Sequence, residues 1–208
     1  MGLASDERAA ICDEFERLGP GKATLCAGWD TRDLLAHLLA RERQLWAAPG
    51  TIVPALAPIM TLAMHRYDST PWPGMIRLLR GGAPFWSPYR GPLDEILNAA
   101  EFFVHHEDAR RGEPGWEPRD PDPARDAALW ALLPRMGWML YRRSNLRVVL
   151  RRPSGEQHAV KAGSGGVVTI VGEPGELVLH AFGRDAVRVK IEGDPAAIAA
   201  LDGTARGI

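Results

Sequence analysis

Hydrophobic residues recur at intervals of three and four through roughly the first two thirds of the chain, a spacing typical of amphipathic helices. Asp30 followed by Asp33 predicts a capped helix start, and Pro49-Gly50 predicts where that helix stops. Pro134 falls inside the last periodic stretch and is expected to kink it or to mark a boundary within it. The expected helices cover residues 5–18, 31–46, 54–67, 73–80, 93–111 and 124–143.

The pattern changes near Ser144, where short β-branched runs replace the helical period. This change divides the chain into a helical domain over residues 1–143 and a small α+β domain over residues 144–208. The fold class predicted for the whole chain is therefore α+β. The expected strands of the second domain cover residues 148–150, 167–171 and 187–191, and its expected helices cover residues 174–182 and 194–203.

The composition of the chain indicates which kinds of binding partner and which cellular compartment to expect. The formal net charge of the 208 residues is −1, so no strong field exists to attract nucleic acid, and none is expected as a partner. Two cysteines, Cys12 and Cys26, make no disulfide framework and fit a reducing compartment as small core residues. The N-terminus lacks the apolar core of a signal peptide, and prolines interrupt the longest apolar stretch, residues 52–64. We expect a cytoplasmic protein with no membrane partner.

Candidate chemistry begins with Glu101 and His105, which stand four residues apart in the helix expected over residues 93–111. Positions i and i+4 share one helix face, so a carboxylate and an imidazole there can hold one divalent ion. On a helical wheel both side chains lie at the edge of the apolar stripe together with Asp108, whereas His106 points nearly the opposite way and is expected at the surface.

A third ligand is available upstream, because His37 lies at the edge of the buried stripe of the helix that follows Asp30. Edge positions in a helical bundle face the space between helices, where bundle metal sites are built. Two imidazoles and one carboxylate suit zinc, with nickel or iron as alternatives, and leave a position for water or substrate. Asp108 would orient a ligand imidazole or bind substrate. A Glu/His pair is also typical of an ordinary surface hydrogen bond, so spacing alone leaves both interpretations open.

The segment from Leu25 to His37 resembles the N-terminal signature of the DinB-like, mycothiol-dependent maleylpyruvate isomerase superfamily. The shared features are the Gly28-Trp29 pair, the Asp33-Leu34 step that opens a helix, and the histidine at the end of the segment. The second signature of that superfamily is similar to Glu101, His105 and Asp108 in their order and spacing. Further segments are similar to an actinobacterial branch of metal-binding proteins of unknown activity: residues 101–111, 115–118 and 148–153.

The resemblance implies a four-helix DinB-like bundle followed by a sterol-carrier-like α+β domain. It also implies a divalent metal, usually zinc, on His37, Glu101 and His105, and a low-molecular-weight thiol such as mycothiol as cofactor. The implied activity is transferase or isomerase chemistry on a small-molecule substrate, with the metal activating the thiol. The segments between the ligand helices are shorter than in the isomerase, so maleylpyruvate itself is not the expected substrate. A homodimer is compatible with such a bundle.

Two other classes of function stay open at this point. One is a non-catalytic module that binds a metal or an apolar ligand, and the other is a metal-dependent hydrolase with water as the nucleophile. Among the remaining residues, Trp29 is expected to pack back on its helix, with a pocket wall as the alternative. His65 and Asp68 are expected to form a polar surface pair, and Arg41 and Arg110 to lie on solvated helix faces.

Overall fold

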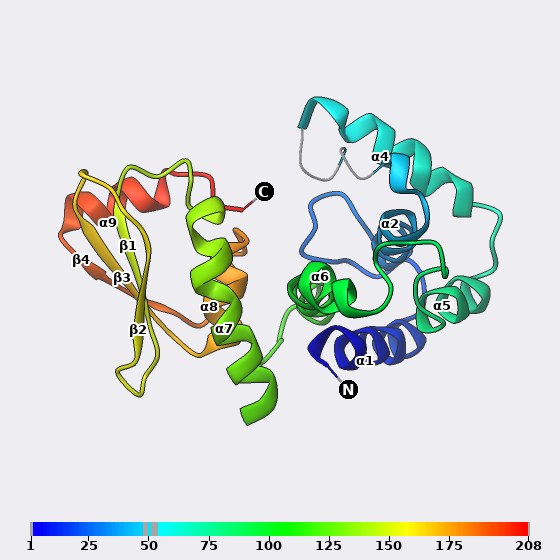
Figure 1. The fold of residues 1–208 in the computed structure, drawn as a ribbon, viewed down its shortest axis with the longest axis horizontal. Coiled ribbons are helices and arrows are strands. Elements are labelled where there is room, and N and C mark those ends of the chain that lie inside the picture. The colour runs from blue at the N-terminus through cyan, green and yellow to red at the C-terminus, as the bar shows by residue number, and fades with distance from the viewer. Residues whose placement is uncertain (1, 48–49, 51–53, 208) are drawn as a thin grey trace. The chain divides into compact units, whose positions relative to one another are not determined.

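The computed structural model describes residues 2–47, 50 and 54–207, and it separates into two compact units, Met1–Glu117 and Pro118–Ile208 (Figure 1). The first unit is helical, and the second combines helices with one four-stranded sheet. This mixture confirms the predicted α+β class. The finer comparison with a four-helix DinB-like bundle and a sterol-carrier-like domain stays a prediction.

Helices α2 and α6 are central to the first unit, because the other helices of the unit pack against one or the other of them or against each other. Helix α1 packs against α6 and α5, and α2 packs against α4, α5 and α6. The elements in chain order are α1 (Leu3–Leu18), α2 (Thr31–Arg43), the 3₁₀ turns η1 (Leu45–Ala47) and η2 (Pro54–Leu56), α4 (Ala57–Met64), the 3₁₀ turn η3 (His65–Tyr67), α5 (Trp72–Arg80) and α6 (Pro92–Arg110).

The predicted cap of α2 is present. The Asp30 carboxylate accepts hydrogen bonds from the backbone N–H groups of Arg32 and Asp33, and the Asp33 carboxylate accepts one from the backbone N–H of Asp30. These bonds satisfy N–H groups that have no partner inside the helix. The helix ends at Arg43, earlier than expected, and η1 follows it. The stop expected at Pro49 lies outside the described residues.

The apolar faces of α1, α2, α5 and α6 meet in one core. Helix α2 is buried on almost all sides, because every residue from Leu34 to Ala40 is buried, which goes beyond the single apolar stripe that the helical period predicts. This core holds the α2 and α6 backbones in place, so the polar side chains at the edges of their buried faces have fixed positions. The largest fully buried side chains of this unit include Ile11, Phe15, Leu34, Leu35, Leu38, Leu39, Met75, Leu79 and Phe102.

The second unit begins with a helix that packs against a four-stranded mixed sheet. The strand order of this sheet is β2-β1-β3-β4. Strand β1 pairs antiparallel with β2 and parallel with β3, and β3 pairs antiparallel with β4. Helix α7 packs against α8 and β2, and α9 packs against β3 and β4. The elements are α7 (Pro123–Leu140), β1 (Arg147–Arg151), β2 (Gln157–Lys161), β3 (Val167–Val171), α8 (Pro174–Ala181), β4 (Lys190–Gly193) and α9 (Pro195–Asp202).

Three features of the second unit differ from the sequence-based expectations. The contacts group α7 with the sheet, whereas the sequence predicts a boundary after residue 143, because periodicity does not reveal which partner a buried helix face will meet. Strand β2 was not predicted, since its five residues are mostly polar and only Val160 is buried. Strand β4 begins at Lys190, later than the expected start at Val187. No helix among the described residues is long and apolar enough to cross a membrane.

Candidate metal centre

Helices α2 and α6 bring the three predicted ligands together. His37 comes from α2, and Glu101 and His105 come from successive turns of α6. Each residue offers one ligand atom, and these atoms all lie within 4.8 Å of one another. Both imidazoles are largely buried, with exposed fractions of 7% for His37 and 8% for His105. The three side chains therefore converge on one place inside the first unit.

The two ring nitrogens of His105 have different partners. Its Nδ1 atom lies 2.9 Å from Oδ2 of Asp108, one turn further along α6, and its Nε2 atom lies 3.5 Å from Oε2 of Glu101. Asp108 has an exposed fraction of 0%, so solvent does not compete for this bond. A carboxylate on one nitrogen fixes the orientation of the ring and makes the other nitrogen a better ligand.

A loop over residues 19–30 brings a thiol to the same carboxylate. The Cys26 thiol donates to Oδ2 of Asp108 at 3.2 Å, and its Sγ atom lies 3.9 Å from Nδ1 of His105. The backbone N–H of Leu25 donates to the carbonyl of Asp108, which docks the loop on the end of α6. Gly112 permits this approach, since a Cβ atom there would overlap the Ala23 carbonyl.

Cys26, His105 and Asp108 form a second group with metal-ligand chemistry, and it shares His105 with the first group. The sequence predicts that Cys26 is a small core residue, and this prediction is wrong. Cys26 is half-buried and its thiol contacts polar groups. The available signal was its position inside the Leu25–His37 segment that carries the first superfamily signature.

The electrostatics of the centre favour a neutral His37 imidazole and an ionised Glu101 carboxylate, the forms in which these side chains bind a cation. Burial lowers the pKa of His37 to about 3, with the charge of His105 acting in the same direction, so its imidazole is neutral at physiological pH. Its Nδ1 atom is buried and makes no hydrogen bond within the described part of the chain. Burial alone would raise the pKa of Glu101, but the charges of Arg41 and His105 outweigh it and hold that pKa well below its ordinary value.

His105 shows the opposite balance. Burial acts to lower its pKa, but hydrogen bonds with Asp108, Cys26 and Glu101 raise that pKa well above the ordinary value for histidine. The surrounding carboxylates and thiol therefore favour positive charge at this ring, the sign of charge that a divalent ion would also bring.

Arg41 does not lie on a solvated helix face, which corrects the expectation for this residue. Its Nη1 atom lies 3.7 Å from Oε2 of Glu101 and donates to Oδ1 of Asn98 at 2.7 Å. Its guanidinium also covers the ring of Tyr89 at 5.2 Å. These contacts hold a positive charge beside the candidate ligand Glu101. Arg110, by contrast, is partly exposed and pairs with Glu107 at 3.0 Å.

Three further predictions from the sequence concern Trp29, the His65–Asp68 pair and His106. The half-buried Trp29 ring stands 5.0 Å from the His37 ring between centroids, so it lines the candidate ligand from one side. His65 and Asp68 form the expected surface pair, with exposed side-chain fractions of 63% and 70%. His106 is buried, contrary to expectation, because α1 covers that face of α6 and presents Glu7, whose Oε2 lies 2.9 Å from its Nδ1.

Comparison with known proteins shows which solved structures share this fold. No protein-family profile matches the chain. No curated protein sequence matches it either. Two solved structures do, the mycothiol-dependent maleylpyruvate isomerase and its histidine-to-alanine mutant, with TM-scores of 0.61 and 0.62. Each match covers 91% of this chain and 90% of the other at 15% sequence identity. The likeness confirms the fold resemblance inferred from the two signatures.

Proposed function

Because the chain shares the fold of the mycothiol-dependent maleylpyruvate isomerase, we propose that it is a divalent-metal-dependent enzyme that uses a low-molecular-weight thiol for transferase or isomerase chemistry. The observation that carries this proposal is the convergence of His37, Glu101 and His105 within 4.8 Å, with Asp108 bonded to the last of them. The thiol is inferred from the structural neighbour, which is mycothiol-dependent.

The residues fit a metal ion. Two ligands at 2.0–2.2 Å from a tetrahedral ion stand roughly 3.3–3.6 Å apart, and Nε2 of His105 lies 3.5 Å from Oε2 of Glu101. The third ligand, His37, is neutral and has a buried nitrogen with no partner in the described residues. Two nitrogens and one oxygen favour zinc, with nickel or iron as alternatives, and leave a coordination position for an exogenous ligand.

A divalent ion bound there supplies Lewis acidity, which lowers the pKa of a thiol that reaches the open position. The chain's own residues prepare that place. Asp108 holds the Nδ1 proton of His105, so Nε2, which lies on the side of Glu101, is the nitrogen that would be presented to the ion. Arg41 balances the charge of Glu101, and the Trp29 ring covers one side of His37. Together they orient the ligands and partly shield them from water.

Metal analysis of the purified protein tests the proposal. We expect about one ion per chain in the wild type and loss of the stoichiometric ion in His37→Ala and His105→Ala. His65→Ala is the matched control, because His65 also pairs with an aspartate three residues on, but at the surface. Retention of the ion by both site variants, or absence of any bound metal in the wild type after add-back, would contradict the proposal.

Thiol dependence separates the proposed enzyme from a metal-dependent hydrolase, the second function compatible with this ligand set. Turnover of candidate substrates should require added mycothiol or a comparable thiol, whereas a hydrolase would act in its absence. The partners we propose are accordingly a small-molecule thiol and a small-molecule substrate. A homodimer and a cytoplasmic location stay predictions.

A further inference from the structure

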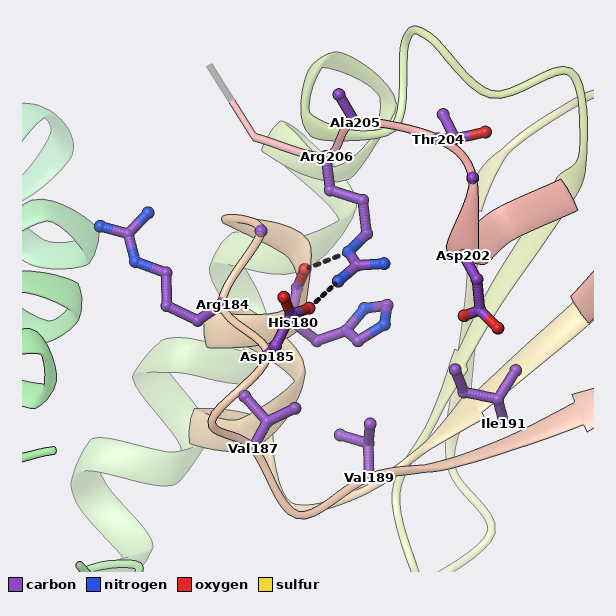
Figure 2. Close-up of a pocket in the computed structure, with 12 residues that line it drawn as sticks. His180, Arg184, Asp185, Val187, Val189, Ile191, Asp202, Thr204, Ala205 and Arg206 are labelled. Carbon is purple, nitrogen blue, oxygen red and sulfur yellow. Dashed lines mark hydrogen bonds and ion pairs between the residues drawn. The ribbon is translucent and has the colours of Figure 1, made fainter. Parts of the chain in front are cut away.

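The second unit contains a cavity of about 710 Å³ that the proposed metal chemistry does not use. It is open to solvent on one side and is lined by the end of α8, the segment that leads to β4, and the end of α9 with the residues that follow it (Figure 2). A volume of this size is ordinary for a site that binds a small molecule. Its walls combine an apolar surface with a few convergent polar groups, and these groups indicate which ligand would fit.

Arg206 places a guanidinium at one wall of the cavity in a fixed orientation. Its Nε atom donates to the carbonyl of His180 at 3.2 Å, and its Nη2 atom donates to Oδ1 of Asp185 at 2.7 Å. The side chain is nine-tenths buried, with 10% exposed. Figure 2 shows that the remaining guanidinium nitrogen points into the cavity. Two bonds therefore hold the group while one nitrogen stays available to a ligand.

The His180 ring lies beside this guanidinium and offers a second donor. Its Nδ1 atom lies 2.8 Å from the hydroxyl of the fully buried Tyr141. No other partner of this hydroxyl is recorded within the described residues, and a phenol that donates to Nδ1 leaves the ring proton on Nε2. Burial and the charge of Arg206 lower the pKa of His180 to about 3, which keeps the ring neutral.

The rest of the cavity limits both the shape and the charge of a ligand. Half-buried Val187, Val189 and Ile191 form an apolar wall, which suits a hydrocarbon body. Asp185 already neutralises part of the charge on Arg206, and Asp202 faces the cavity from the end of α9. A singly charged head is therefore favoured over a doubly charged one, which the two carboxylates would repel.

We propose that this cavity is a binding site for a small organic monocarboxylate, with its carboxylate on Arg206 and His180 and its hydrocarbon part against Val187, Val189 and Ile191. One carboxylate oxygen can accept from the guanidinium nitrogen that points into the cavity, and the other can accept from Nε2 of the imidazole. Its lining residues all belong to the second unit, and none of them is a candidate metal ligand.

Binding of hexanoate to the full-length protein, followed by NMR of the His180 and Arg206 side chains, tests this inference. We expect saturable shifts of both side chains with an affinity on the order of millimolar or tighter. Hexanamide and hexyl phosphate should each bind at least about tenfold more weakly, since one lacks the charge and the other carries too much. Equal or tighter binding of either probe, or no shift at either side chain, would overturn the proposal.

Variants identify where the probe binds. Arg206→Gln should weaken hexanoate binding by at least about tenfold, whereas Arg147→Gln, the same change at an exposed position on β1, should leave it unchanged. Ala205→Trp fills the cavity from an exposed position and keeps Arg206, so it tests the site even if Arg206→Gln fails to fold. His37→Ala should bind hexanoate normally. Unchanged binding in Ala205→Trp, or loss of binding in His37→Ala, would refute a separate site in the second unit.

Discussion

Oδ2 of Asp108 lies 2.9 Å from Nδ1 of His105, and this bond leaves Nε2 of the same ring 3.5 Å from Glu101. Asp108 therefore decides which nitrogen of His105 is presented to the candidate metal centre. The bond is shielded from solvent, because Asp108 is fully buried. A carboxylate in this position strengthens a metal–imidazole bond without touching the ion.

Asp108→Asn should weaken zinc binding by roughly tenfold to a hundredfold, because the amide can still orient the ring but no longer carries the charge that strengthens its Nε2 as a ligand. Competition with a chromophoric chelator measures this affinity. Asp68→Asn is the matched control, since Asp68 forms the same type of pair with His65 at the surface. Equal zinc affinity in Asp108→Asn and the wild type would show that the carboxylate does not act on the metal ligand.

Cys26→Ala should retain one metal ion per chain. The thiol donates to Asp108 rather than facing Glu101, so we expect it to tune His105 and not to coordinate the ion. Cobalt-substituted protein gives a direct readout, because a thiolate ligand produces a sulfur-to-cobalt charge-transfer band in the near ultraviolet. The wild type should lack this band. Its presence, together with its loss in Cys26→Ala, would place the ion instead on Cys26, His105 and Asp108.

The sequence predicts those parts of the centre that depend on local geometry. Helical spacing places Glu101 one turn from His105, and the cap at Asp30 fixes the start of the helix that carries His37. Both helices form close to the expected residues, so their polar edge positions converge as the wheel suggests. The superfamily signatures added a resemblance in fold, which the two solved structures then confirmed.

Non-local contacts account for what the sequence did not predict. Cys26 reaches Asp108 because a loop folds over the end of α6, and no periodic pattern describes that loop. His106 is buried because α1 happens to cover it with Glu7. The assignment of α7 to the second unit depends on which surface its apolar face meets, and the cavity beside Arg206 depends on three separate segments.

Gly137→Ala should destabilise the second unit by about 1–3 kcal/mol. Gly137 lies where α7 crosses β2, and a Cβ atom there would stand 2.6 Å from Cβ of Val160. Urea unfolding followed by circular dichroism measures the change. Gly203→Ala is the control, because its added Cβ would meet neighbours at ordinary distances of 3.6 Å and more. Similar stabilities of the two variants would mean that α7 does not press this closely on β2.

The stability of the second unit should fall as the pH drops below about 6.5, the pKa of an unfolded histidine, in part because of His180. Burial and the charge of Arg206 lower the pKa of the folded-state ring to about 3. Between these two values the unfolded chain binds the proton and the folded chain does not, so acid favours unfolding by up to about 1.4 kcal/mol per pH unit.

His180→Gln lacks this proton, so its stability should depend less steeply on pH than that of the wild type. Urea unfolding of the metal-free proteins at several pH values between 7 and 5 measures the two slopes. Identical slopes would show that the His180 ring does not lose its proton on folding.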